Sequence, residues 1–163
     1  MEILNVNSQE FKNILTACFS GGGIIPVIGA GFSKGSEAFN GKVPDGNALI
    51  QMMLYTLKKA GVLEPEKIEK IKSMDFKAIS RYYLNEKYVP RSYFVEDIRN
   101  NFTQVNISGV RRTFLKQNWK YIYTLNIDDG IERANRNITK VLPYKELDKK
   151  AQDINLLYKI HGC

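Results

Sequence analysis

The feature that most constrains the fold is a short, continuously apolar run that ends in a glycine-rich loop. Residues 24–28 read Ile-Ile-Pro-Val-Ile, and residues 29–35 read Gly-Ala-Gly-Phe-Ser-Lys-Gly. Such a run is typical of a strand buried on both faces of a parallel sheet. Glycines directly after a strand let a phosphate approach the backbone N–H groups. The pattern predicts an α/β fold with a ligand-binding loop after its first strand.

The remaining periodicity predicts how the fold is organised. Strands are expected at residues 119–125, 138–142 and 156–160, and an amphipathic helix at residues 8–19. Residues 47–117 have helical spacing almost throughout. A chain of 163 residues can bury one ordinary core. We therefore predict a single domain over residues 1–163, with a Rossmann-like parallel sheet flanked by helices and a mostly helical insertion at 47–117.

Polar or glycine-rich clusters follow three of the predicted strands. They are residues 29–35, residues 124–128 (Thr-Leu-Asn-Ile-Asp) and His161-Gly162. In a parallel sheet all three would meet at the carboxyl edge, where open α/β sheets bind ligands. The sequence therefore predicts one cleft that combines the glycine loop, Asn126 and His161.

Each of these features also has a purely structural interpretation. The glycine loop is one residue longer than the usual dinucleotide fingerprint and lacks the ending of a P-loop, so it could be a tight turn without a ligand. His161, the single histidine, could be a hydrogen-bonded structural residue. Asn126 could close a strand, and Asp128 and Asp129 could cap a helix.

Composition narrows the classes of partner. The formal net charge of +7 favours anionic partners in general, but the basic residues alternate with acidic ones as on a solvated helix face. No recognised nucleic-acid motif accompanies the charge, so we do not expect a nucleic-acid module. Two cysteines, Cys18 and Cys163, are too few for a disulfide framework or a four-cysteine zinc site. We expect a cytoplasmic protein that binds no membrane.

Three segments taken together resemble the signatures of the sirtuin superfamily. They are Gly29-Ala30-Gly31-Phe32-Ser33, Thr124-Leu125-Asn126-Ile127-Asp128 and Lys159-Ile160-His161-Gly162. The resemblance extends over roughly residues 22–162, and the helical stretch is its divergent part. Sirtuin deacylases have Pro-Asp-Phe-Arg where this chain has Pro44-Asp45-Gly46-Asn47, and they carry a four-cysteine zinc module after the His-Gly signature.

These two departures make the chain more similar to the sirtuin-like NADases of bacterial anti-phage systems. That family's domain continues well past His-Gly, so we expect this chain to be the N-terminal fragment of a longer protein. The resemblance implies NAD+ as the substrate, no metal, and hydrolysis of the nicotinamide glycosidic bond to nicotinamide and ADP-ribose, which would deplete NAD in anti-phage defence. It also implies a homo-oligomer and a phage-derived activator or partner subunit.

The resemblance assigns roles to eleven residues. Backbone donors to the diphosphate would come from Gly29, Ala30, Gly31 and Phe32, and Ser33 would approach a phosphate or a ribose hydroxyl. Thr124 is placed among the NAD-binding residues, and Asp128 with the Ile127 backbone would hold the nicotinamide carboxamide. Asp45 would fix the nicotinamide end of the pocket. Asn126 would orient the attacking water, and His161 would act as the acid-base group.

Other functions remain open at this stage. An NAD-dependent protein deacylase is the alternative within enzymes. A sensor that binds NAD or ADP-ribose without turnover is the main alternative outside them, and a nucleic-acid module is supported by charge alone. Products distinguish the enzymes, because hydrolysis yields free ADP-ribose whereas deacetylation yields O-acetyl-ADP-ribose.

Overall fold

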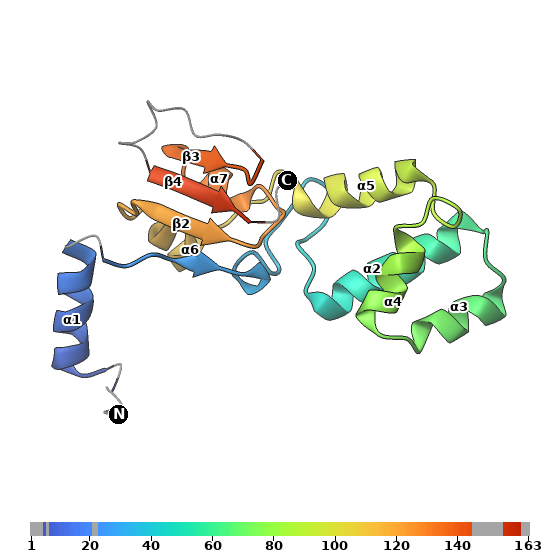
Figure 1. Cartoon of the computed structure of the whole chain (residues 1–163), viewed down its shortest axis with the longest axis horizontal. Coiled ribbons are helices and arrows are strands. Elements are labelled where there is room, and N and C mark those ends of the chain that lie inside the picture. The colour runs from blue at the N-terminus through green and yellow to red at the C-terminus, as the bar shows by residue number, and fades with distance from the viewer. Residues whose placement is uncertain (1–4, 6, 21–22, 145–154, 161–163) are drawn as a thin grey trace.

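A parallel sheet forms the centre of the fold. The computed structural model describes residues 5, 7–20, 23–144 and 155–160. In this part of the chain the sheet has the strand order β1-β2-β4-β3, with β1 at Val27–Ile28, β2 at Tyr121–Thr124, β3 at Ile138–Val141 and β4 at Asn155–Lys159. All neighbouring strands pair in parallel. The predicted α/β fold with a Rossmann-like sheet is confirmed (Figure 1).

The first strand differs from its prediction in length and burial. Only Val27 and Ile28 of the expected 24–28 segment form the strand, and β1 lies at an edge of the sheet. Ile28 is 4% exposed, whereas Val27 is 72% exposed. The expectation of a strand buried on both faces is therefore wrong. An edge strand tolerates Pro26, which has no N–H to donate, while its carbonyl still accepts from the amide of Tyr123 at 2.9 Å.

Helices account for most of the chain outside the sheet. The predicted opening helix is α1 (Gln9–Ser20), and the glycine loop contains a 3-10 turn, η1 (Ala30–Phe32). The predicted helical insertion is confirmed. Its helices are α2 (Gly46–Ala60), α3 (Pro65–Lys72), α4 (Phe76–Tyr83), α5 (Arg91–Phe102) and α6 (Gly109–Leu115), and α7 (Gly130–Ala134) follows β2.

The buried apolar side chains form two main clusters. One lies between the sheet and the helices α6 and α7, and it includes Ile122 and Leu157. The other lies among α2, α3 and α4 and includes Leu57, Ile71 and Ile79. Figure 1 shows the corresponding arrangement, with α2 to α4 beside one another and away from the sheet. The helices of the insertion therefore belong to two different clusters: α6 packs against the sheet, and α2 to α4 pack among themselves.

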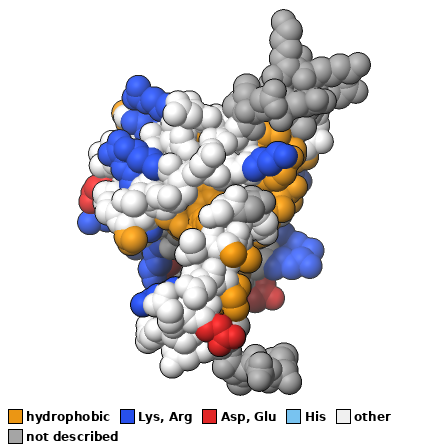
Figure 2. All heavy atoms as spheres, turned by 90° about the vertical axis from the view of Figure 1, so that its left-hand side faces the viewer, with side chains coloured by type: hydrophobic (Ala, Val, Ile, Leu, Met, Phe, Trp, Pro, Cys, Tyr) orange, Lys and Arg blue, Asp and Glu red, His pale blue; other side chains and the backbone are white. Residues whose placement is uncertain are grey.

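Figure 2 presents the distribution of charge on one face of the molecule. Figure 2 shows Lys and Arg side chains scattered over the face that it presents, with apolar side chains between them, and no single basic patch. Helix α1 has no buried residue, although the Phe19 ring lies 4.9 Å from that of Trp119. No helix in the described ranges is long and apolar enough to cross a membrane.

The first prediction concerns the core under the sheet. Leu157 is fully buried, so Leu157→Ala should lower the free energy of unfolding by about 2–5 kcal/mol, through lost transfer free energy and a residual cavity. Val110 is 82% exposed, so Val110→Ala should change it by about 0.5 kcal/mol or less. Urea unfolding measures both values. Equal effects of the two substitutions would contradict this packing.

Candidate functional site

The loops after β1 and β2 meet at the carboxyl edge of the sheet. Ile28 and Thr124, the last residues of these strands, are register partners. The Thr124 hydroxyl donates to the carbonyl of Ile28 at 3.1 Å and accepts from the amide of Asn126 at 3.0 Å. The side chain of Thr124 therefore ties the two strand ends together and starts the turn into the second loop.

A buried hydrogen-bonded cluster joins the two loops. Asn126 Nδ2 donates to Ser33 Oγ at 3.0 Å, and Ser33 Oγ donates to Asp128 Oδ1 at 3.1 Å. Ser33 is 0% exposed, and Asn126 and Asp128 are 4% and 3% exposed. Because these side chains are buried and bonded to one another, each is held in one orientation. Asn126 Oδ1 is buried and has no hydrogen-bond donor within the described part of the chain.

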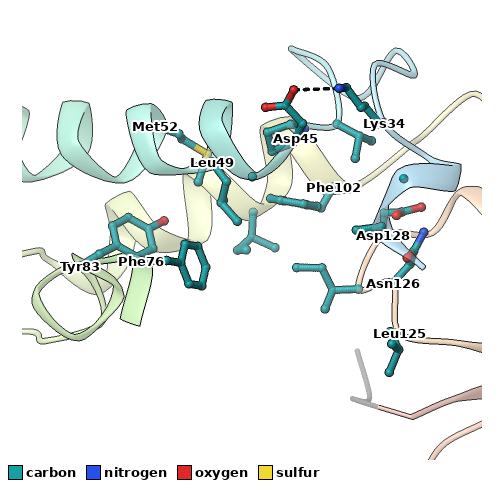
Figure 3. Close-up of a pocket in the computed structure, with 17 residues that line it drawn as sticks. Lys34, Asp45, Leu49, Met52, Phe76, Tyr83, Phe102, Leu125, Asn126 and Asp128 are labelled. Atoms are coloured by element: carbon teal, nitrogen blue, oxygen red, sulfur yellow. Dashed lines mark ion pairs between the residues drawn. The ribbon is translucent and has the colours of Figure 1, made fainter. Parts of the chain in front are cut away.

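Asn126 and Asp128 face a cavity of about 540 Å³. Figure 3 shows these two side chains at one end of the cavity and Phe76 and Tyr83 at the other. The walls between them are apolar, and they include Leu49 from α2. A mostly apolar cavity with a few oriented polar groups is the usual form of a small-molecule site.

The glycine loop borders two hollows. Gly31 lines the 540 Å³ cavity and also a second one of about 450 Å³, which Gly29, Phe32 and Phe114 help to line. A Cβ atom added at Gly31 would have no atom within 4 Å, so the absent side chain leaves open space. The amide of Phe32 donates to the Gly29 carbonyl at 3.0 Å and is used inside the turn.

The six predicted residues that line the larger cavity are Ala30, Gly31, Asp45, Asn126, Ile127 and Asp128. Gly29 and Phe32 line the smaller one. Ser33 and Thr124 are buried beside these walls and their hydroxyls are bonded within the chain. From the sequence we expected Ser33 to approach a phosphate or a ribose hydroxyl. In the structure its buried hydroxyl is instead bonded to Asn126 and Asp128. His161 lies outside the described residues.

Asp45 has a local role that the sequence analysis missed. Its Oδ1 accepts from the amide of Ala48 at 2.8 Å and so caps α2, while its Oδ2 pairs with Lys34 at 3.0 Å. The backbone hydrogen bond and Lys34 lower the pKa of Asp45 from its usual value. An ionised carboxylate and a cation therefore stand together at the rim of the cavity.

Asp128 is in the opposite electrostatic environment. Burial raises its pKa from the usual value, against the lowering effects of the Gly130 amide, the Ser33 hydroxyl and the Lys159 charge. A Cβ at Gly130 would lie 2.8 Å from Asp128 Oδ1, so only glycine permits this close approach. The neighbouring Asp129 does not cap α7 with its side chain, because its carboxylate accepts from the amides of Gln104 and Val105.

Two basic residues support the loops, and the sequence analysis did not single them out. Arg111 Nη1 donates to the carbonyls of Phe32 at 2.7 Å and Lys34 at 3.2 Å. Lys159, in β4, is 2% exposed and donates to the Asp128 carbonyl at 2.6 Å. A lysine among the apolar residues of the strand predicted at 156–160 was the available signal, because lysine is almost never buried without a partner.

The second prediction is a pH dependence set by Asp128. Its pKa is raised in the folded state, so the folded chain binds this proton more tightly than the unfolded chain. The stabilisation from that proton is lost as the pH rises from 3.8 through the folded-state pKa. Asp128→Asn removes this titration. The unfolding free energy of the parent, relative to Asp128→Asn, should therefore fall with rising pH when both are measured in urea between about pH 3 and pH 7.

Asp45→Asn is the matched control for this measurement. The pKa of Asp45 is lowered, so the parent should gain stability over Asp45→Asn as the pH rises through the same range. The two differences should slope in opposite directions. If the two stability differences change with pH in the same direction, the electrostatic environments described for Asp45 and Asp128 are wrong.

No group of three or more His, Cys, Asp or Glu side chains within the described ranges is placed to hold a metal ion. Comparisons of the chain with protein-family models, curated proteins and solved structures found no match.

Proposed function

We propose that this chain binds NAD+ across the glycine loop and hydrolyses its nicotinamide glycosidic bond. The observation that carries the proposal is the Ser33, Asn126 and Asp128 cluster, which fixes two polar side chains in the wall of a cavity beside the glycine loop. The nature of the ligand and of the reaction comes from the sequence, because the three signature segments resemble those of sirtuin-like NADases. The resemblance alone suggests NAD depletion in anti-phage defence, a homo-oligomer and an activating partner.

The glycine loop is suited to the diphosphate. Gly29 and Gly31 have no side chain, and a Cβ at either would meet no atom within 4 Å, so a ligand can come close to the backbone there. Gly31 borders both cavities. We propose that the dinucleotide extends from one into the other past this residue. Asp128, Ile127 and Asp45 would then take the nicotinamide end in the larger cavity.

Asn126 supplies a polar side chain to the proposed reaction. In hydrolysis a water oxygen forms a bond to C1′ of the ribose, and the bond from C1′ to the nicotinamide nitrogen breaks, with its electron pair going to the ring. The ribose develops oxocarbenium-like positive charge. The Nδ2 group of Asn126 is bound to Ser33, and its buried Oδ1 lacks a donor in the described residues. We propose that a ribose hydroxyl or the water supplies that donor when the ligand is bound.

His161 is proposed as the group that takes the proton of the water. This role rests on the sequence, where His161 directly follows the predicted strand at residues 156–160 and stands two residues after Lys159, the last residue of β4. An imidazole titrates close to neutral pH and suits proton transfer there. The proposed reaction uses no metal, because the leaving nicotinamide is neutral once the glycosidic bond has broken.

The third prediction tests ligand placement. Gly31→Val puts a branched side chain into open space at the border of the two cavities, so the fold should survive while NAD affinity falls at least tenfold. Gly23→Val is the control, since Gly23 lines neither cavity and its Cβ would meet only Cys18 O at 3.8 Å. Calorimetry with NAD measures both. If folded Gly31→Val binds NAD with the affinity of the parent, the diphosphate does not bind at this loop.

The fourth prediction tests the catalytic pair. Asn126→Ala and His161→Ala should each lower nicotinamide release at saturating NAD by about 10²- to 10⁴-fold, and the double variant should lose little more than the slower single one. Asn135→Ala is the matched control for Asn126. Asn135 is also a buried asparagine, and it binds the Leu115 carbonyl at 2.8 Å away from the cavity. The Asn135→Ala variant should have a lower free energy of unfolding than the parent and the same rate of nicotinamide release.

Two results would count against these assignments. If both variants release nicotinamide at the rate of the parent, neither Asn126 nor His161 takes part in the reaction. A parent-like rate in His161→Ala alone would leave His161 a structural residue.

A further inference from the structure

Lys159 carries a buried charge behind the loop that follows β2. Its Nζ donates to the carbonyl of Asp128 at 2.6 Å and to that of Ile127 at 3.5 Å, and it forms an ion pair with Glu132 Oε1 at 3.0 Å. An ammonium group has three donors, and all three have acceptors here. The side chain of Lys159 is 1% exposed and that of Glu132 is 21% exposed, so solvent screens this pair little.

The sheet register explains why the amine reaches this loop. Thr124 and Lys159 are register partners in the neighbouring strands β2 and β4. Paired residues on adjacent strands share one face of the sheet, so Lys159 extends on the same face as Thr124. The loop that leaves β2 then passes within reach of its amine.

The two carbonyls that Lys159 binds belong to residues that line the 540 Å³ cavity. Their backbone is therefore held from one side by an ammonium group, while Ser33 fixes the Asp128 side chain from another. Packing alone would not need a charge at this place. An apolar side chain in β4 could fill the space but could not bind two carbonyls.

We propose that Lys159 is a positioning residue, which sets where the Asn126–Asp128 loop stands relative to the nicotinamide end of the substrate. This inference rests on the proposed function. Without the amine the two carbonyls lose their donor, and the loop can move while its side-chain cluster stays intact. A displacement of about 1 Å at a reacting group can cost on the order of 10²-fold in rate.

The test uses the whole chain and a small set of variants. Lys159→Met leaves Glu132 without its partner and can fail to fold, so Lys159→Met/Glu132→Gln removes both charges together. Lys159→Arg keeps the charge and the donors. Glu132→Gln alone keeps an acceptor for Lys159. Lys140→Met is the matched control, because Lys140 is an exposed lysine in the neighbouring strand β3.

Amide hydrogen exchange reports the loop without any activity. The amides of Asn126, Asp129 and Gly130 are bonded to Thr124 Oγ1, the Phe102 carbonyl and Asp128 Oδ1. In the double variant their exchange should accelerate at least tenfold, while Ile122 in the strand exchanges as in the parent. Nicotinamide release at saturating NAD should fall on the order of 10²-fold, and ADP-ribose affinity should stay unchanged, because its diphosphate lies on the other loop.

Lys159→Arg should recover part of the rate, and Lys140→Met and Glu132→Gln should resemble the parent. Parent-like exchange in the double variant would overturn the proposal, as would faster exchange with a parent-like rate. An equal loss of ADP-ribose affinity would also overturn it, because the damage would then be general. If the parent itself releases no nicotinamide, the proposed function fails, and the exchange data still decide whether Lys159 holds the loop.

Discussion

Two hydrogen bonds at one buried hydroxyl hold the candidate site together. Ser33 Oγ accepts from Asn126 and donates to Asp128, and so it links segments more than 90 residues apart in the sequence. The parallel pairing of β1 with β2 makes this possible, because both loops then leave the same edge of the sheet. Without that pairing, the two loops would not meet in the wall of the cavity.

The sequence predicted the sheet and the meeting of the two loops well. Apolar runs identify strands, and the direction of parallel pairing follows from helices between them, so Ile28 and Thr124 were expected at one edge. It did not predict the exposure of Val27, because position within a sheet depends on long-range pairing. It missed the roles of Ser33 and Lys159 for the same reason: their partners, Asn126 and Asp128, are distant in sequence, and no local pattern records such a contact.

The two carboxyl groups of the cavity differ in their burial and in their hydrogen-bond partners. At its rim, Asp45 is ionised beside Lys34, while deeper in the wall Asp128 holds its proton to a higher pH than an exposed carboxyl would. Lys159 and the Gly130 amide limit that rise. Buried polar groups of this kind are retained where they are bonded to one another, and they are oriented without further cost when a ligand arrives.

Nuclear magnetic resonance of the isotope-labelled whole chain during NAD addition tests the central claim most directly. The account predicts that the amides of residues 29–33 and 126–130 shift first and most, and that the resonances of free nicotinamide and ADP-ribose then grow together. Shifts confined to other surfaces, or no shift at millimolar NAD, would contradict the proposed site. Shifts at these two loops without any free nicotinamide would contradict the proposed reaction and leave a binding domain.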